Sequence, residues 1–377
     1  MNAPTTDATA RPEAAPPSRD ASGSPPRYRG TGLLHPRLTD PLALLLAVGI
    51  LATGTLAITL GSVHIGTGAI WDVVQLKAGL VQGIDVPVYL QQIVWDLRMP
   101  RVVLAALVGA ALSLAGVAVQ GLVRNPIADP YVLGVSSGSS VGAAFVLLFG
   151  GLGGLGSAAV SVGAFVSGLL AMTVVYLLAQ DRGQLEPLRL VLVGVVLSYV
   201  FSGLTSFLVF KGDPRAAQEV LFWLLGSFGR ARWSGVLIPL GALVVAAVIL
   251  AIRARALDAL LSGDEAAAAL GVDLRRLRLE LFFTATGLTA VMVAASGAVA
   301  FVGLVVPHLT RMIVGSLHRR VLPIAALGGA LFMMWVDLAA RYLAAPQEIP
   351  LGIITSLAGG PLFVVLLRRQ QKRRSQL

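Results

Sequence analysis

The chain has 377 residues, of which 56% are hydrophobic and only 13% are charged, so it has too few charges to cover a soluble protein of this size. Its formal net charge of +10 does not indicate a nucleic-acid partner, because the arginines stand in short segments between apolar runs. The absence of cysteine excludes disulfides, thiolate chemistry and cysteine-ligated metal sites. The composition therefore predicts an integral membrane protein.

The N-terminal residues 1–38 are rich in Pro, Ala, Ser and Arg and contain no apolar run. A signal peptide needs such a run, so we interpret this segment as a retained, disordered cytoplasmic tail. A regulatory role is the alternative. The membrane domain is predicted to occupy 39–369, and residues 370–377 to form a basic cytoplasmic C-terminal tail.

Apolar runs of the length that crosses a bilayer follow one another from residue 41 onward. A helical crossing needs about 20 apolar residues. The boundary between the seventh and eighth runs is the least defined, because only Ser296 and Gly297 separate them. The predicted spans are 41–61, 101–121, 133–150, 156–179, 188–210, 234–252, 278–296, 298–314, 322–343 and 350–367. The sequence thus predicts an all-α, polytopic protein with about ten transmembrane helices.

Basic residues are unevenly distributed between the two sets of connecting segments. The set assigned to the cytoplasm contains the clusters at 253–278, 311–320 and 368–374, and the other set contains fewer arginines and lysines. Because basic residues are enriched on the cytoplasmic side, we expect both termini inside and an even number of spans. A bacterial cytoplasmic (inner) membrane is the expected location.

Two connecting segments are predicted to have structure of their own. The outer segment 62–98 mixes apolar and polar residues and is expected to lie partly on the membrane surface. The inner segment 253–277 contains a helix-forming run from Asp264 to Leu270, followed by Gly271 as a helix stop. A helix on the cytoplasmic side suggests a docking surface.

The sequence contains one short internal similarity and two matches to enzyme motifs. Residues 115–123 resemble 297–305, and transporters are often built from related halves. Residues 151–156 fit the dinucleotide fingerprint and 134–138 fit the hydrolase nucleophile elbow, but both motifs require a preceding strand. A flexible hairpin is expected at 151–156, and close helix packing or a polar notch at 134–138.

The sequence contains little that would serve catalysis or ion coupling. It has no P-loop motif, and its four histidines show no metal-ligand spacing, so no cofactor or metal is expected. Asp337 is the clearest acidic residue within a span, and Arg341 lies four residues later on the same helical face. A structural ion pair is the simpler interpretation of these two residues.

A set of motifs in matching order resembles the FecCD family of ABC transporter permeases, which import ferric siderophores, haem and cobalamin. The resemblance covers essentially everything after residue 40. The motifs are 95–101 (WDLRMPR), 108–112 (VGAAL), 116–120 (GVAVQ), 124–130 (RNPIADP), 133–138 (LGVSSG), 223–227 (WLLGS), 269–272 (ALGV), 301–308 (FVGLVVPH) and 348–355 (EIPLGIIT).

The resemblance implies a type II ABC importer permease fold, in which ten-helix subunits pair as a homodimer or with a paralogue. Two ABC ATPase subunits would dock below and a substrate-binding protein above, and the permease itself would not be an enzyme. The residues that the resemblance assigns to these roles are Arg98, Arg101 and Arg341 for binding-protein docking, Asp264, Glu265, Ala266, Gly271 and Val272 for ATPase coupling, and Ser198, Ser202, Thr205 and Ser206 for the translocation path.

Ferric siderophore is the first expected cargo, with haem and cobalamin as alternatives. An ion-coupled secondary transporter is the main alternative of another class, although buried carboxylates are scarce in the spans. A membrane scaffold or sensor that uses the long tail as its output is a further alternative. Membrane lipids are expected contacts, and nucleic acid is not.

Overall fold

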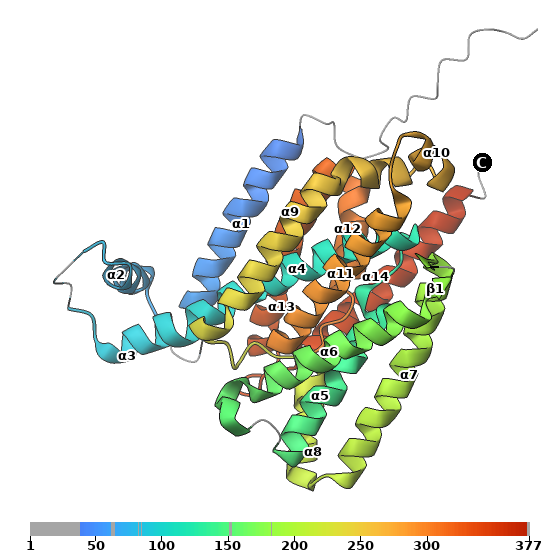
Figure 1. Cartoon of the computed structure of the whole chain (residues 1–377). Coiled ribbons are helices and arrows are strands. Elements are labelled where there is room, and N and C mark those ends of the chain that lie inside the picture. Colours follow the sequence, from blue (N-terminus) through green and yellow to red (C-terminus); the bar gives the residue numbers. More distant parts are fainter. Residues whose placement is uncertain are drawn as a thin grey trace, which may run out of the picture. The chain divides into compact units, whose positions relative to one another are not determined.

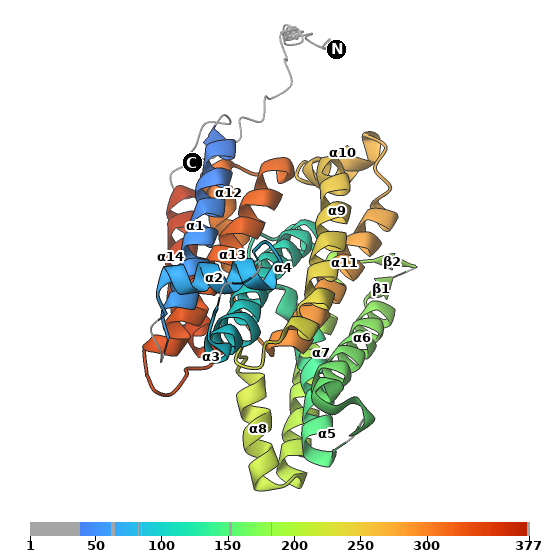
Figure 2. The same ribbon diagram turned by 90° about the vertical axis from the view of Figure 1, so that its left-hand side faces the viewer.

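A computed structural model describes residues 38–61, 65–81, 83, 85–150, 153–181 and 183–374. These residues form mainly helices (Figures 1 and 2). The predicted tails lie outside the described residues, apart from Leu38 and 370–374.

The helices are α1 (Thr39–Thr59), α2 (Thr67–Lys77), α3 (Val88–Gln91), the π-helix η2 (Gln92–Arg98), α4 (Met99–Val123), η3 (Pro130–Leu133), α5 (Val135–Phe149), η4 (Gly153–Ala158), α6 (Ala159–Leu178), α7 (Pro187–Lys211), α8 (Pro214–Leu224), η5 (Trp233–Gly235), α9 (Leu237–Leu260), α10 (Asp264–Ala269), α11 (Leu274–Ser296), α12 (Val302–Val314), α13 (His318–Tyr342) and α14 (Leu351–Arg374). Strands β1 (Gln180–Asp181) and β2 (Gln184–Leu185) form a short antiparallel hairpin.

Seven helical stretches are long and apolar enough to cross a membrane. They contain α1, the continuous helix 88–123, α6, α7, α9 with η5, α11 and α13. Three shorter apolar helices are α5, α12 and the part of α14 from Leu351 to Val364. The chain is therefore a multi-pass membrane protein, while the count of ten spans and the position of the termini stay predictions.

The core of the bundle is built around α4. It packs against α13, α11, α12 and α9, and most of its residues are buried. Two of its glycines allow backbone contact: a Cβ added to Gly109 would lie 2.1 Å from the Gly329 carbonyl oxygen, and one added to Gly116 would lie 1.8 Å from the Gly303 carbonyl oxygen. Small residues at such crossings let membrane helices approach closely.

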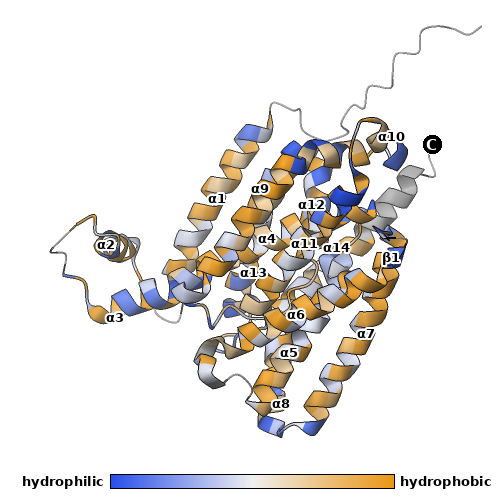
Figure 3. Ribbon diagram, viewed as in Figure 1, coloured by the Kyte–Doolittle hydropathy of each residue, from blue (hydrophilic) through white to orange (hydrophobic). Residues whose placement is uncertain are grey.

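The outer faces of several helices expose large apolar side chains. On α7 these include Leu192, Tyr199 and Phe210, and on α9 they include Leu237 and Ile252. Figure 3 shows hydrophobic residues along α7 and α9, and hydrophilic residues near α10 and the adjoining ends of α9 and α11. A surface of this kind requires lipid or a protein partner to cover it.

Several helix boundaries differ from the predicted ones, and those at 88, 260 and 274 change the interpretation of nearby residues. The span predicted from residue 101 continues a helix that begins at Val88, so the end of the outer segment 62–98 is helical and joins that span. Pro100 stands at the start of α4, just after the π-helix η2. The helix α9 continues to Leu260, and α11 begins at Leu274. Arg253 therefore lies within a helix, where it forms an ion pair with Glu280 of α11. The apolar stem of arginine packs along the helix while its guanidinium group is paired, so the residue is tolerated at the end of an apolar helix.

The least defined boundary of the sequence is a true helix break. Helix α11 ends at Ser296, and Gly297 and Phe301 have left-handed φ angles of 72° and 70° before α12 begins. The similar segment 115–123 is uninterrupted helix in α4, so the internal similarity does not mark equivalent structural elements. The two segments instead pack against each other where Gly116 meets Gly303.

Candidate translocation site and its flanking clusters

A cavity of about 390 Å³ lies between α7, α5 and the loops that precede α5 and α12. All four residues predicted for the translocation path line it. Sequence reasoning did not assign its other residues to the path. The lining residues are Tyr131, Ser136, Ser137, Ser140, Ser198, Ser202, Thr205, Ser206, Leu224 and Ala298.

Helical spacing explains why so many hydroxyl groups converge. Ser198, Ser202, Thr205 and Ser206 recur at intervals of three or four residues along α7, which places them on one helical face. On α5 the serines at 136, 137 and 140 repeat this pattern. The same periodicity in the sequence could have identified the α5 serines as residues of the cavity. The polar notch expected at 134–138 is confirmed, and its Gly138 also packs tightly against Ala171.

Tyr131 is held in the cavity wall from two sides. The Asp129 carboxylate accepts a hydrogen bond of 2.8 Å from the Tyr131 backbone N–H. The Tyr131 phenol oxygen accepts one of 2.6 Å from the backbone N–H of Val299, in the break between α11 and α12. The connection before α5 and the break before α12 are thus joined next to the cavity.

The described residues that line the cavity carry hydroxyl groups on a largely apolar wall, and none of them is charged. Several hydroxyls are satisfied by their own helices, such as Ser198 on the Gly194 carbonyl and Ser140 on the Ser136 carbonyl. The buried hydroxyl of Thr205 has no partner among the described residues. Such a wall can offer weak hydrogen bonds to a passing polar solute without holding it tightly. Within the part of the chain described, no cluster of three or more metal-ligating side chains occurs.

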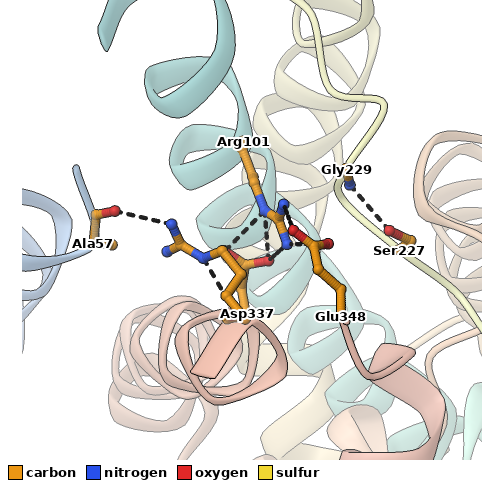
Figure 4. A network of polar contacts seen from close by, with 7 residues as sticks. Ala57, Arg101, Ser227, Gly229, Asp337 and Glu348 are labelled. Atoms are coloured by element: carbon orange, nitrogen blue, oxygen red, sulfur yellow. Dashed lines mark hydrogen bonds and ion pairs between the residues drawn. The ribbon is translucent and has the colours of Figure 1, made fainter. Parts of the chain in front are cut away.

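The three predicted docking arginines lie near the C-terminal ends of α1 and α13, and Figure 4 shows Arg101 beside Asp337 and Glu348. Arg101 forms ion pairs of 2.8 Å with Asp337 and 2.7 Å with Glu348. Arg341 reaches the same Asp337 carboxylate at 3.3 Å, which confirms the expected ion pair within α13. Asp337 is 2% exposed, whereas the Glu348 side chain is 45% exposed.

Two of these arginines also donate hydrogen bonds to carbonyl oxygens in the last turn of α1. Arg98 donates to the carbonyl oxygens of Ile58 and Thr59, and Arg341 donates to that of Ala57. The last turn of α1 has no basic residue of its own, so the two guanidinium groups compensate its negative helix end. The arginines are largely buried in these contacts, and their docking role stays a prediction.

Close to this cluster, three segments share backbone hydrogen bonds. Leu351 and Gly352, at the start of α14, donate to the carbonyls of Gly226 and Leu225, while Ser227 donates to that of Ser296. Leu224 and Ala298, which flank these segments, line the hydroxyl cavity. Glu348 stands just before α14, so the arginine cluster and the cavity are connected through a few residues of backbone.

The predicted coupling segment has the expected form. Helix α10 begins at Asp264 and ends at Ala269, and Gly271 follows with a left-handed φ of 80°. Glu265 and Gly271 are exposed, Ala266 and Val272 partly so. The Asp264 carboxylate pairs with Arg278 at 2.7 Å and with Arg124 at 3.2 Å, and the coupling role of these residues stays a prediction.

The sequence of this helical bundle matches a known family. The sequence model of the FecCD transport family matches residues 46–369. The chain belongs to the FecCD transport family. The members of this family are transporter permease subunits, which are not themselves enzymes, and this FecCD chain is an ABC importer permease.

Named relatives agree with this assignment. The chain is 37% identical over 347 residues to the hemin transport system permease protein HmuU of Yersinia pestis, covering 91% of this chain and 99% of that protein. It is 35% identical over 333 residues to the iron(3+)-hydroxamate import system permease protein FhuB of Bacillus subtilis, covering 88% and 84%. Further relatives are named as cobalamin and molybdate import permeases.

A solved structure supports the same fold. It is described as an inward-facing conformation of a metal-chelate type ABC transporter, is 34% identical to this chain and superposes with a TM-score of 0.74. The match covers 89% of this chain and all of the other. The predicted resemblance to the FecCD family is therefore confirmed.

Proposed function

We propose that the chain forms half of the membrane channel of an importer that carries an iron complex, with a ferric siderophore as first choice, across a bacterial inner membrane. A second permease subunit would cover the apolar face of α7, two ABC ATPase subunits would bind at α10, and a substrate-binding protein would bind at the arginine cluster. The supporting observation is the hydroxyl-lined cavity on α7 in a chain of this family.

The chemistry of the cavity suits a bulky, polar cargo. A wall of serine and threonine hydroxyls offers hydrogen bonds without a charge that would trap a chelate, and conduction needs contacts weak enough to release the solute. Relatives named for hemin and iron-hydroxamate transport support iron, and those named for cobalamin and molybdate keep other cargos as alternatives. No side chain identifies one complex.

An ion-coupled carrier is less well supported. Such carriers use ionisable side chains in the membrane as relays. Among the described residues that line the cavity none is ionisable except the phenol of Tyr131. Two acids are buried among the described residues. Asp337 lies between two arginines, and Asp129, next to the cavity, accepts a hydrogen bond from the Tyr131 backbone N–H.

Filling the cavity should stop uptake. In cells that depend on this gene for uptake of radiolabelled iron bound to a hydroxamate siderophore, Ser202→Trp is expected to lower the initial rate by at least about tenfold, because an indole would occupy the polar path. The matched control is Val248→Trp on α9, whose side chain is 52% exposed and does not line the cavity.

Uptake assays can test the identity of the cargo and the ATP-driven mechanism separately. Loss of iron uptake on deletion of the gene, restored by the wild-type gene, would support an iron importer. Unchanged iron uptake would move the cargo to haem or cobalamin, to be assayed in the same cells. Uptake that needs a proton gradient but no ATPase partner would contradict the importer mechanism altogether.

Docking of the binding protein should respond to Glu348. This half-exposed carboxylate occupies both terminal nitrogens of Arg101, which a partner carboxylate would need. Glu348→Gln is therefore expected to tighten binding of the substrate-binding protein by about threefold to tenfold, the scale typical of a partly exposed charge pair. Binding would be measured by surface plasmon resonance on the purified importer in nanodiscs.

The control for this prediction is Glu219→Gln on α8, an exposed acid outside the arginine cluster. It should leave the dissociation constant unchanged. Equal binding by the Glu348→Gln importer and the wild type would argue against Arg101 as a docking residue. An Arg101→Glu variant would be a less clean test, because its new carboxylate would stand beside those of Asp337 and Glu348.

A further inference from the structure

Asp264 stands at the meeting point of three elements. Its Oδ2 atom contacts Arg278 in the second turn of α11 at 2.7 Å and Arg124 at the end of α4 at 3.2 Å. The Asp264 side chain is 32% exposed, and its Oδ1 atom is buried without a partner among the described residues. A single carboxylate thus joins α10 to two helices of the membrane core.

Helix α10 is bounded by a glycine on each side. Gly263 and Gly271, on either side of α10, have left-handed φ angles of 104° and 80°, which glycine adopts without strain. Within α10, Ala267 is fully buried, whereas Leu270 just beyond it is 73% exposed. The helix therefore has one face on the protein and one available to a partner.

Arg124 is held in an unusual conformation. Its φ of 53° lies in the left-handed region, at a helix end where glycine is the usual residue. A non-glycine residue there costs of order 1 kcal/mol, so the side chain has a role that offsets strain. The contact that the structure gives it is the one with Asp264.

Each of the two arginines lies in a stretch of chain that leads to the hydroxyl-lined cavity. Arg124 opens the connection that contains Tyr131, a cavity residue. Arg278 lies on α11, whose end at Ser296 is followed by the cavity residue Ala298. A displacement of α10 would therefore act on two walls of the cavity through one carboxylate.

We infer that Asp264 is a positioning residue that couples movement of α10 to the translocation cavity, rather than a residue that contacts the ATPase. The inference rests on the proposed function. Movement of α10 driven by an ATPase would pull on α4 and α11 together through Arg124 and Arg278. Without the carboxylate, α10 would move by rotation at Gly263 and Gly271, and this movement would not displace the segments that line the cavity.

The test uses the complete importer, purified with its own ATPase and reconstituted in liposomes with the binding protein. Asp264→Asn is expected to lower iron-hydroxamate uptake per ATP hydrolysed by about tenfold, within the range for mutations along a coupling route, while ATPase binding and hydrolysis persist. Asp264→Glu should restore most of the coupling. The double variant Asp264→Asn with Arg278→Gln should have the same uptake per ATP as Asp264→Asn alone, because both substitutions remove the same contact between Asp264 and Arg278.

The matched control is Asp273→Asn, at the carboxylate that caps α11 through the Arg276 N–H. Asparagine caps as well as aspartate, so uptake per ATP should not change. Normal coupling in Asp264→Asn would overturn the inference, as would loss of ATPase binding, which would place Asp264 at the interface. A wild-type complex that transports no cargo would instead contradict the proposed function.

Discussion

Replacing Asp337 by alanine is expected to lower the free energy of unfolding by about 3–5 kcal/mol, the cost typical of leaving a buried charge unpaired. This carboxylate is 2% exposed and pairs with both Arg101 and Arg341. Without it, Arg341 would lose its carboxylate partner and Arg101 would keep only the half-exposed Glu348. Since Arg341 also holds the Ala57 carbonyl, the contact of α1 with α13 should loosen. Denaturant unfolding in detergent micelles, followed by tryptophan fluorescence, would measure the change.

The chain offers a matched control for this prediction. Asp181 forms an ion pair with Arg189, but their side chains are 55% and 44% exposed. Asp181→Ala should cost less than about 1 kcal/mol, because solvent screens an exposed pair. Equal losses in the two variants would show that the cluster at Asp337 is open to water and does not tie the helices together.

Replacing Gly116 by alanine should have the second large effect. The added Cβ would lie 1.8 Å from the Gly303 carbonyl oxygen, which is backbone and cannot rotate away. Helices α4 and α12 would have to separate, at a cost of about 2–3 kcal/mol for overpacking. Because Gly303 also packs on Pro130, next to the cavity residue Tyr131, uptake should fall with stability. Unfolding and uptake would be measured on the same preparation.

Gly241 provides the control of opposite sign. It lies within α9 and a Cβ there would meet nothing within 4 Å. Gly241→Ala should therefore stabilise the protein by up to about 1 kcal/mol through the higher helix propensity of alanine. If both variants unfolded alike, close glycine packing between α4 and α12 would not hold the core together.

Much of the fold could be predicted from local sequence. Long apolar runs predict membrane helices because the bilayer core leaves backbone groups no other partners, and seven of them are confirmed by length and composition. The helical run at Asp264 and its stop at Gly271 are confirmed for a similar reason, since both depend on a few adjacent residues. The predicted helix end at Ser296 is confirmed, while the next helix begins at Val302 instead of residue 298.

The environment of single side chains could not be predicted this way. Arg98, Arg101 and Arg341 read as exposed outer arginines, yet the structure buries them against carbonyls of α1 and against Asp337. Asp264 read as part of a surface, yet it turns inward. In each case the partner lies far away in sequence, and no local pattern specifies it.

Sequence alone determined the class of this protein, the position of most of its helices, its family and one face of the cavity on α7. These follow from hydrophobic length, helical periodicity and motif order, which are properties of neighbouring residues. Only the tertiary structure decided that a second row of serines on α5 completes the cavity, that α4 meets α12 through two glycines, and that one carboxylate joins α10 to the core. Such contacts depend on how distant helices cross, and crossing geometry is set by packing over the whole bundle.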